Sequence, residues 1–529
     1  MNQHPSPSFP QSLPLRRSTS RCLPLMLAGI ATGCTFQVDS TQDLPDADPG
    51  DFACDTGRGQ CTLRAAIMEA NFFPTVDRIL VPAGTYDLDL PTNSGGGRLV
   101  ISNPVTVQGA GKSTTIVNQT VNDAVFQITA GDVAANNLTV QGGDAQAGGG
   151  FNIGAAVVDI ADAVIRDNFG FTGGGGILVA AGGDVRLRRV TIRDNEATGA
   201  FGGGIWNQGT LWVYESEVTD NQSNRAGGVR NSSNLNLRNV TVSGNHANSP
   251  DAGVGGISQN GFAVLNNVTI TQNTGVGNNA GSFRGGGIQT SVGATTVMKN
   301  SIVAGNDGGI GPDDCVGSLT ADSKYNLIGS TEDCMIPAFV FTYILDQDAN
   351  LGALALNGGS TRNHMTNTNS PARDTAYQFP PPAIDACESH DQRGVPRPQG
   401  VGQCDMGAVE YTTNSQFVTG FVLVDADADA DIRPLLHGDT LALSTLPPEL
   451  SIRAQIVSAP GSVLFDLDAT TGYRTENLSP YALGGDDGGN YNPVALTAGE
   501  HSIRATPFSQ ANGAGAAGGS WSITFNVVD

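Results

Sequence analysis

Short runs of alternating apolar and polar residues recur between residues 137 and 306, and each run leads into a polar corner. Val190 and Ile192 alternate with polar neighbours in one run, and Val268 and Ile270 do so in a later one. A repeat of roughly 25–30 residues predicts a solenoid. An asparagine follows each run, and by subtraction the spacings are 27, 26, 24, 28 and 33 residues for Asn168, Asn195, Asn221, Asn245, Asn273 and Asn306.

The composition of each repeat indicates which kind of solenoid to expect. The β-branched runs are separated by Gly, Asn and Asp, and they carry no helical apolar stripe of useful length. One turn is therefore expected to consist of short strands that pair in parallel with their copies, at about 4.8 Å per turn. We expect the corner asparagines to adopt the left-handed conformation and to hydrogen-bond from turn to turn as a ladder.

Glycine pairs precede the runs, for example Gly175-Gly176 and Gly203-Gly204. The whole pattern resembles the right-handed parallel β-helix of the pectin-lyase-like superfamily. This resemblance implies an all-β fold with a single-stranded parallel β-helix over residues 76–345. It implies no particular function, because enzymes, adhesins and phage spikes share the architecture.

The ends of the solenoid carry their own motifs. Residues 54–75 include Cys61-Thr62-Leu63-Arg64-Ala65-Ala66, which resembles the CSLREA domain without its acidic member, and they predict a short capping helix. Residues 346–411 resemble the choice-of-anchor Q domain of bacterial surface proteins, which implies a C-terminal cap. Residues 416–529 alternate at strand period, which predicts an antiparallel, Ig-like β-sandwich.

The N-terminus reads as an export signal over residues 1–33, with three arginines before an apolar run at residues 23–30. Ala31-Thr32-Gly33-Cys34 resembles a lipobox, which implies lipidation of Cys34 and a membrane anchor; the alternative is ordinary cleavage that leaves Cys34 as a plain thiol. Residues 34–53, rich in Asp and Pro, are expected to be a tether. We therefore expect an outer-membrane or cell-surface lipoprotein, or alternatively a secreted protein.

Six further cysteines flank the repeats, and an oxidising compartment favours disulfides between them. Fifteen connectivities are possible for six cysteines, and proximity favours a local scheme. The expected pairs are Cys54 with Cys61, Cys315 with Cys334, and Cys387 with Cys404.

The formal net charge of −23, with only three lysines, argues against nucleic acid as a partner. No cofactor is expected, although two acidic groups could bind calcium. Asp167, Asp194 and Asp220 would form a carboxylate row along the stacked corners, or else they simply cap backbone amides. The second group resembles an incomplete calcium loop or a solvated turn and consists of Asp425, Asp427, Asp429 and Asp431.

Aromatic residues are rare, and three of them fall in one repeat. Strand alternation places Trp212 and Tyr214 on the same side, so they could offer a sugar-stacking surface, although core packing is equally compatible with the pattern. We take the candidate ligand groove to consist of Trp206, Trp212, Tyr214, Asp194, Asp220 and Arg230.

A second charged cluster is more consistent with buried ion pairs than with catalysis, namely Asp391, Arg393, Asp405 and Glu410. The sequence shows no catalytic signature that we can match. The leading hypothesis is a non-enzymatic surface adhesin that binds glycan or protein. The rival hypotheses are a polysaccharide lyase or hydrolase with a groove along the helix, and a purely structural envelope protein.

Overall fold

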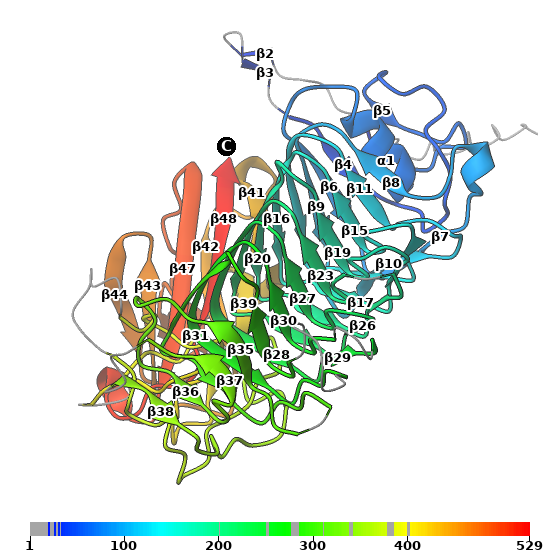
Figure 1. The fold of residues 1–529 in the computed structure, drawn as a ribbon. Helices are drawn as coiled ribbons and strands as arrows, with labels where there is room; N and C mark the ends of the chain where they lie inside the picture. The colour runs from blue at the N-terminus through cyan, green and yellow to red at the C-terminus, as the bar shows by residue number, and fades with distance from the viewer. Residues whose placement is uncertain are drawn as a thin grey trace, which may run out of the picture.

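The computed structural model describes residues 20–21, 26–27, 30–31, 33–199, 201–249, 253–276, 285–309, 311–337, 342–377, 386–398 and 402–528. The chain is nearly all β, and its body is a parallel β-solenoid of about nine turns, followed by antiparallel sheets (Figure 1). The predicted fold class is therefore confirmed.

Each turn contributes strands to stacked parallel sheets, which we number by their order within one middle coil, such as β15, β16, β17 and β18. Sheet 1 runs down the visible face of Figure 1. Its strands are β8 (Leu99–Ile101), β11 (Phe126–Ile128), β15 (Phe151–Ile153), β19 (Ile177–Val179), β23 (Ile205–Asn207), β27 (Val229–Asn231), β30 (Ile257–Gln259), β32 (Ile288–Thr290), β35 (Cys315–Ser318) and β37 (Asp333–Met335).

Sheets 2 and 3 meet at a corner, which two long strands, β28 (Asn234–Ser243) and β31 (Phe262–Thr271), pass without a break. Sheet 2 also contains β4 (Thr35–Gln37), β6 (Asp77–Val81), β9 (Val105–Gly109), β12 (Asp132–Asn136), β16 (Val157–Ala161), β20 (Asp184–Arg188), β24 (Thr210–Tyr214) and β33 (Thr295–Lys299). Sheet 3 also contains β7 (Gly84–Leu88), β10 (Thr115–Gln119), β13 (Thr139–Gln141), β17 (Val164–Arg166), β21 (Thr191–Arg193), β25 (Glu217–Thr219), β34 (Ile302–Val303), β36 (Leu327–Ile328) and β38 (Ile344–Leu345).

A narrow fourth sheet closes the turn with β14 (Asp144–Ala145), β18 (Phe169–Gly170), β22 (Glu196–Ala197), β26 (Gln222–Ser223) and β29 (His246–Ala247). Inside the turns, apolar side chains stack in register: Ile192 pairs with Val218, and Val242 with Ile270. These four side chains have no exposed surface. The repeat period seen in the sequence is thus the length of one coil, and one continuous core runs from Phe36 to Ile328.

The asparagine ladder is confirmed. The Nδ2 atom of Asn195 donates to Oδ1 of Asn221 at 2.9 Å, and Nδ2 of Asn221 donates to Oδ1 of Asn245 at 3.0 Å. The backbone N–H of each also donates to the same Oδ1, as in Asn221 to Asn245 at 3.1 Å. Equivalent side-chain bonds link Asn168 to Asn195, Asn245 to Asn273 and Asn273 to Asn306, and Asp314 accepts the last one.

The expectation that the ladder asparagines adopt the left-handed conformation is wrong, because the left-handed residue is the one before each asparagine. The residue before each of them has φ > 0, for example Asp194 at 55° and Asp220 at 56°. A second left-handed residue lies five positions earlier, at Arg189 and Glu215 in the same coils. In these coils, the sheet 3 strand therefore lies between two left-handed residues. The ladder asparagines keep ordinary backbone geometry and turn their amides inward, since Asn221 and Asn245 are fully buried.

The N-terminal helix α1 (Leu63–Ala70) is confirmed, and the Thr62 hydroxyl accepts from the Ala65 amide at its start. Residues 34–53, in contrast, are not the extended tether that their composition suggested. β4 pairs in parallel with β6, and Phe36 and Val38 are buried. Asp43 forms a buried ion pair with Arg64 of α1 at 2.6 Å. This segment is therefore part of the first coil.

Cys34 belongs to this packed segment. Its backbone amide donates to Asp77 Oδ1 at 2.7 Å, and its side chain is buried and disulfide-bonded. A sulfur atom in a disulfide cannot also carry a lipid, so the predicted lipidation of Cys34 could apply only to a processed chain. The signal-peptide prediction for residues 1–33 falls mostly outside the described residues. The other three disulfides form as predicted, between Cys54 and Cys61, Cys315 and Cys334, and Cys387 and Cys404.

The C-terminal residues build two facing sheets, as expected for a β-sandwich, around Phe421, Phe465 and Phe525. The first sheet contains β40 (Ala430–Leu435), β39 (Phe417–Asp425) and β42 (Leu450–Val457). The second contains β41 (Asp439–Ala442), β48 (Trp521–Val528), β47 (Gly499–Phe508), β43 (Ser462–Leu467) and β44 (Thr470–Glu476), with β41 parallel to β48.

The sandwich does not extend the rod but lies along its flank, so that its strands run beside the coils (Figure 1). Asp439 pairs with Arg78 of the first coils at 3.1 Å, and the Asn137 amide donates to the His437 carbonyl at 3.4 Å. Gly438 permits this approach, because its φ is 79° and a Cβ there would lie 2.9 Å from Asn136 Nδ2.

Residues 346–411 cover the last coils, as expected for a cap, and also run back along sheet 3. The Arg362 guanidinium contacts Glu217 at 2.9 Å, and Gln392 accepts from the Thr241 hydroxyl at 2.6 Å. These side chains therefore join the cap to the middle of the rod as well as to its end.

Candidate functional site

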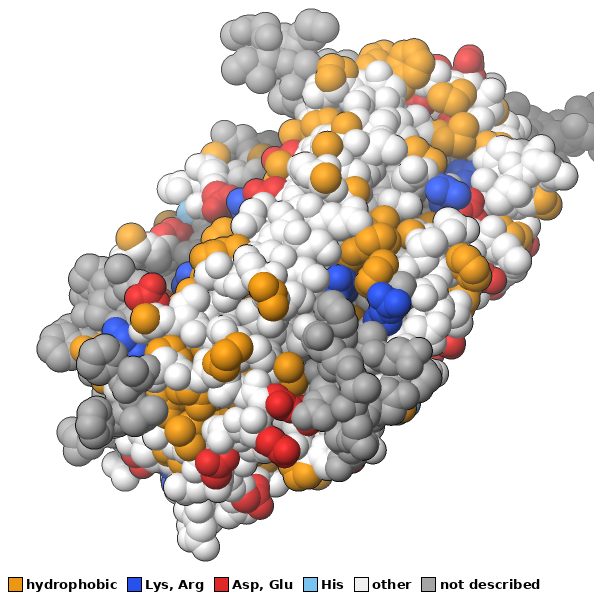
Figure 2. Space-filling view, viewed as in Figure 1, with side chains coloured by type: hydrophobic (Ala, Val, Ile, Leu, Met, Phe, Trp, Pro, Cys, Tyr) orange, Lys and Arg blue, Asp and Glu red, His pale blue; other side chains and the backbone are white. Residues whose placement is uncertain are grey.

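The six residues of the predicted groove do not come together; the structure divides them among three places. Trp206 and Arg230 are neighbours on sheet 1, where Arg230 Nη1 donates to the Ser258 hydroxyl at 2.6 Å. Arg230 also lies over the Phe201 ring, 5.0 Å from its centroid. Figure 2 shows that this side of the rod carries few charged side chains along its middle, despite the strongly negative net charge.

Asp194 and Asp220 occupy the corner after sheet 3. Asp194 pairs with Arg193, and Asp220 pairs with Arg362 of the cap at 3.1 Å. Asp167 pairs in the same way with Arg166 at 2.7 Å. Each carboxylate of the predicted calcium row is therefore neutralised by an arginine. Among the described residues, no group of three or more His, Cys, Asp or Glu side chains is placed to hold a metal ion.

Trp212 and Tyr214 lie on β24 in sheet 2, and here strand alternation is confirmed. Leu211 and Val213 have no exposed surface, whereas the two aromatic side chains are half-buried on the outer face. The planes of their rings are nearly parallel, with centroids 6.5 Å apart and an interplanar angle of 4°. β24 thus presents two neighbouring aromatic side chains on its outer face.

Charged and amide side chains surround these rings because the neighbouring strands are in register. Arg186 and Asn236 flank Trp212, and Arg188 and Arg238 flank Tyr214. The Arg188 guanidinium lies 5.8 Å from the centroid of the Tyr214 ring. We call this surface the aromatic platform and define it as Asp159, Asp184, Arg186, Arg188, Trp212, Tyr214, Asn236 and Arg238.

The ion pairs of the platform are loose. Arg186 lies 3.9 Å from Asp159 and 3.8 Å from Asp184, and its side chain is 51% exposed. Arg238 contacts Glu388 of the cap at 3.4 Å. Exposed pairs of this kind contribute at most about 1 kcal/mol each, so a polar ligand can exchange for them at small cost. Burial raises the pKa of Asp159 and of Tyr214.

Sequence reasoning found the two aromatic residues but missed their neighbours. The sequence did contain the information needed to find them. By subtraction, Arg186 lies 26 residues before Trp212 and Asn236 lies 24 residues after it, and these spacings equal the length of one coil. Aligning the repeats on their ladder asparagines would therefore have placed these residues side by side. Glu388 could not have been found in this way, since it comes from the cap.

The charged cluster of the cap is structural, as expected. Asp391 and Arg393 form an ion pair at 2.7 Å, and Arg397 and Glu410 another at 3.1 Å, with all four side chains at most 2% exposed. Asp405 accepts backbone N–H groups of Asp374 and Tyr411, and burial raises its pKa. These charges hold the loops of residues 346–411 together.

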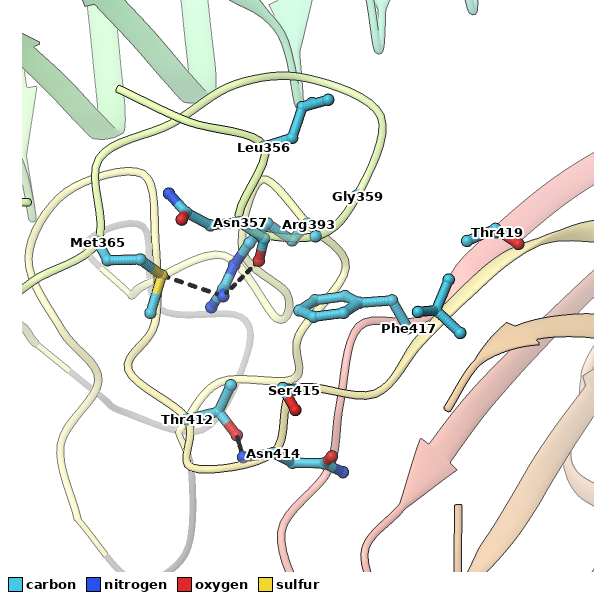
Figure 3. Close-up of a pocket in the computed structure, with 12 residues that line it drawn as sticks. Leu356, Asn357, Gly359, Met365, Arg393, Thr412, Asn414, Ser415, Phe417 and Thr419 are labelled. Atoms are coloured by element: carbon cyan, nitrogen blue, oxygen red, sulfur yellow. Dashed lines mark hydrogen bonds between the residues drawn. The ribbon is translucent and has the colours of Figure 1, made fainter. Parts of the chain in front are cut away.

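A cleft of about 550 Å³ lies between the cap and the start of the sandwich. Figure 3 shows the residues that line it. The Phe417 ring points toward Arg393, whose Nη1 donates to the Asn357 carbonyl at 3.3 Å and lies 3.1 Å from Met365 Sδ. Because Arg393 is already held by Asp391 and these contacts, the cleft offers apolar surface and few free polar groups.

The four aspartates at Asp425, Asp427, Asp429 and Asp431 do not converge on one point. Asp425 Oδ1 accepts the backbone amides of Asp427 and Ala428, which is the pattern of a turn. Asp431 instead pairs with Arg453 across the sheet. The turn interpretation therefore describes this segment.

No protein-family model, curated protein or solved structure matches the chain. The resemblances to the CSLREA and choice-of-anchor Q domains therefore rest on the quoted motifs alone. In the described part of the chain, no helix is both long and apolar enough to span a bilayer.

Proposed function

We propose that the protein is exported and binds glycans at its surface through the aromatic platform, without chemically converting them. The observation that carries the proposal is the pair of Trp212 and Tyr214, which face outward from one strand with their ring planes nearly parallel. The C–H face of a sugar ring packs on an aromatic ring, and two aromatic rings side by side on one strand offer apolar contacts to one extended glycan chain. Flexible surface side chains would not keep this geometry.

The polar groups beside the rings fit the same ligand. Guanidinium and carboxylate groups form the stronger class of hydrogen bonds, and sugar hydroxyls can serve them as donors and as acceptors. Arg186, Asp159 and Asn236, which lie on neighbouring strands in register with Trp212, would serve this purpose along the rod axis. Their mixed charges favour a neutral or weakly charged glycan over a polyanion.

Export is also supported by the state of the cysteines. The described cysteines are all disulfide-bonded, and disulfides persist in oxidising compartments. The predicted outer-membrane location and lipid anchor belong to this proposal.

A glycan array probed with the purified protein tests the proposal. Binding is expected to one class of extended glycan and to be lost in Trp212→Ala. Bound glycans are then incubated with the protein and assayed for reducing ends and for unsaturated uronates. New reducing ends alone would indicate a hydrolase and unsaturated uronates a lyase, and either result would replace the non-enzymatic proposal.

A further inference from the structure

A second cleft opens where the sandwich meets the first coils, and it shares no residue with the platform. Its volume is about 730 Å³, within the range of small-molecule sites. Sheet 2 provides the floor through Arg78, Leu80 and Gln108, and the sandwich provides the wall. The wall is mostly apolar and includes Pro434, Leu436, Leu441, Ala442 and Leu446.

Two buried donors in this cleft have no acceptor. The Nε2 atom of Gln108 and the Nε atom of Arg78 both lack a hydrogen-bond partner among the described residues. Gln108 is only 3% exposed. A buried polar group without a partner costs roughly 1–3 kcal/mol, so native structures rarely keep such a group without a reason. Gln108 pairs with Leu80, two residues from Arg78, so both donors belong to one end of the floor.

The charges that line the cleft indicate that the missing acceptor for these two donors is negatively charged. Arg78 and Arg433 share the single carboxylate of Asp439, at 3.1 Å and 2.5 Å. The lining thus carries two positive charges and one negative, in a chain whose net charge is −23. Burial lowers the pKa of Arg78, and Arg433 acts in the same direction. One monovalent anion would balance the site and accept from both donors.

We infer that this cleft binds a small amphiphilic monocarboxylate, with the carboxylate at Arg78 and Gln108 and the hydrocarbon chain along the sandwich wall. A ligand held in this way would touch both the first coils and the sandwich. It would therefore also strengthen their contact, which otherwise depends on a few polar links such as Arg78 with Asp439.

Calorimetric titration of the full chain with decanoate tests the inference. Decanoate is expected to bind with one-to-one stoichiometry. Acetate lacks the chain, and decanol and decyltrimethylammonium lack the carboxylate, so each should bind at least about tenfold more weakly. Decanol binding as tightly as decanoate would contradict recognition of the charge, and absence of decanoate binding would overturn the inference.

Variants then locate the site. Gln108→Leu removes one donor without adding a charge, so decanoate affinity should fall about tenfold while the weaker decanol affinity stays the same. Ala442→Trp places a large side chain in the space beside the wall, so it should abolish the binding of both decanoate and decanol. Gln146→Leu, at an exposed residue outside the cleft, is the matched control. Circular dichroism checks each fold, and unchanged decanoate binding in folded Gln108→Leu and Ala442→Trp proteins would refute the site.

Discussion

At the scale of single residues, the ladder asparagines contribute to the stability of the rod by linking neighbouring coils through buried hydrogen bonds. Asn221 makes a bond in each direction along the rod, because its Oδ1 accepts two bonds from Asn195 and its Nδ2 donates to Asn245 and to the Ile192 carbonyl. No water can replace these bonds at a residue with no exposed surface. The ladder therefore ties each coil to its neighbours.

Replacing Asn221 by Leu should lower the free energy of unfolding by about 1–3 kcal/mol, because it leaves the buried backbone N–H of Asn195 without its acceptor. Hydrogen exchange should rise in the adjoining coils as well, since coupling in a solenoid passes between neighbours. Gln222→Leu, one residue later and exposed, is the control. An Asn221→Leu protein as stable as this control would contradict the ladder account.

The ladder and the outward position of Trp212 and Tyr214 on β24 could be predicted from the sequence. The first depends only on the repeat length, and the second depends only on the alternation of side chains along a strand. The left-handed position was misassigned by one residue, since Asn and Asp both tolerate φ > 0 and stand next to each other at Asp194 and Asn195. Trp206 was also grouped with Trp212, which is near it in sequence. A coil turns through several sheets within 30 residues, so this proximity did not bring them onto one face.

At the scale of elements, the first coil shows where composition misleads. Residues 34–53 are acidic and rich in proline, yet they contribute β4 and a buried carboxylate to the fold. The alternation of Phe36 and Val38 is only one strand long, which is too short to stand out from the polar residues around it. Burial of Asp43 depends on Arg64 of α1, and such a partner can be recognised only in three dimensions.

Asp43→Ala should destabilise the N-terminal coil strongly, because it leaves Arg64 buried without its partner. Removing one member of a buried pair typically costs about 3–5 kcal/mol. Limited proteolysis should then cleave the variant within residues 34–75 before any other region. Asp48→Ala, at an exposed position, should behave as wild type. Equal protease resistance in both variants would restore the tether interpretation.

At the scale of the whole molecule, the contact between sandwich and rod partly buries the side chain of His437. His437 faces Arg189, Arg188 and Asp162 of the coils, and burial together with the arginines lowers its pKa from 6.5 to about 4. Its Nδ1 accepts from the Thr524 amide at 3.1 Å, which requires the neutral ring. No sequence pattern predicts this contact, because it depends on how the sandwich packs against the rod.

The protein should therefore lose stability on acidification. A lowered folded-state pKa means that the unfolded chain binds the proton more readily, so the contribution of His437 is complete above pH 6.5 and declines toward pH 4. The full effect corresponds to about 3 kcal/mol. His437→Gln removes this proton site, so its unfolding free energy should fall less than that of wild type between pH 7 and pH 4. Parallel curves for the two proteins would contradict the assignment.

The most direct test of the account is the affinity of the platform for a glycan that is positive on the array. Isothermal titration compares the wild type with three variants. Trp212→Ala and Tyr214→Ala test glycan binding on sheet 2, and Trp206→Ala tests glycan binding on sheet 1. Loss of one stacked ring should weaken binding about tenfold, as expected for about 1–2 kcal/mol of aromatic contact, whereas Trp206→Ala should leave the affinity unchanged. Unchanged affinity in both sheet 2 variants, or a loss confined to Trp206→Ala, would contradict the proposed function.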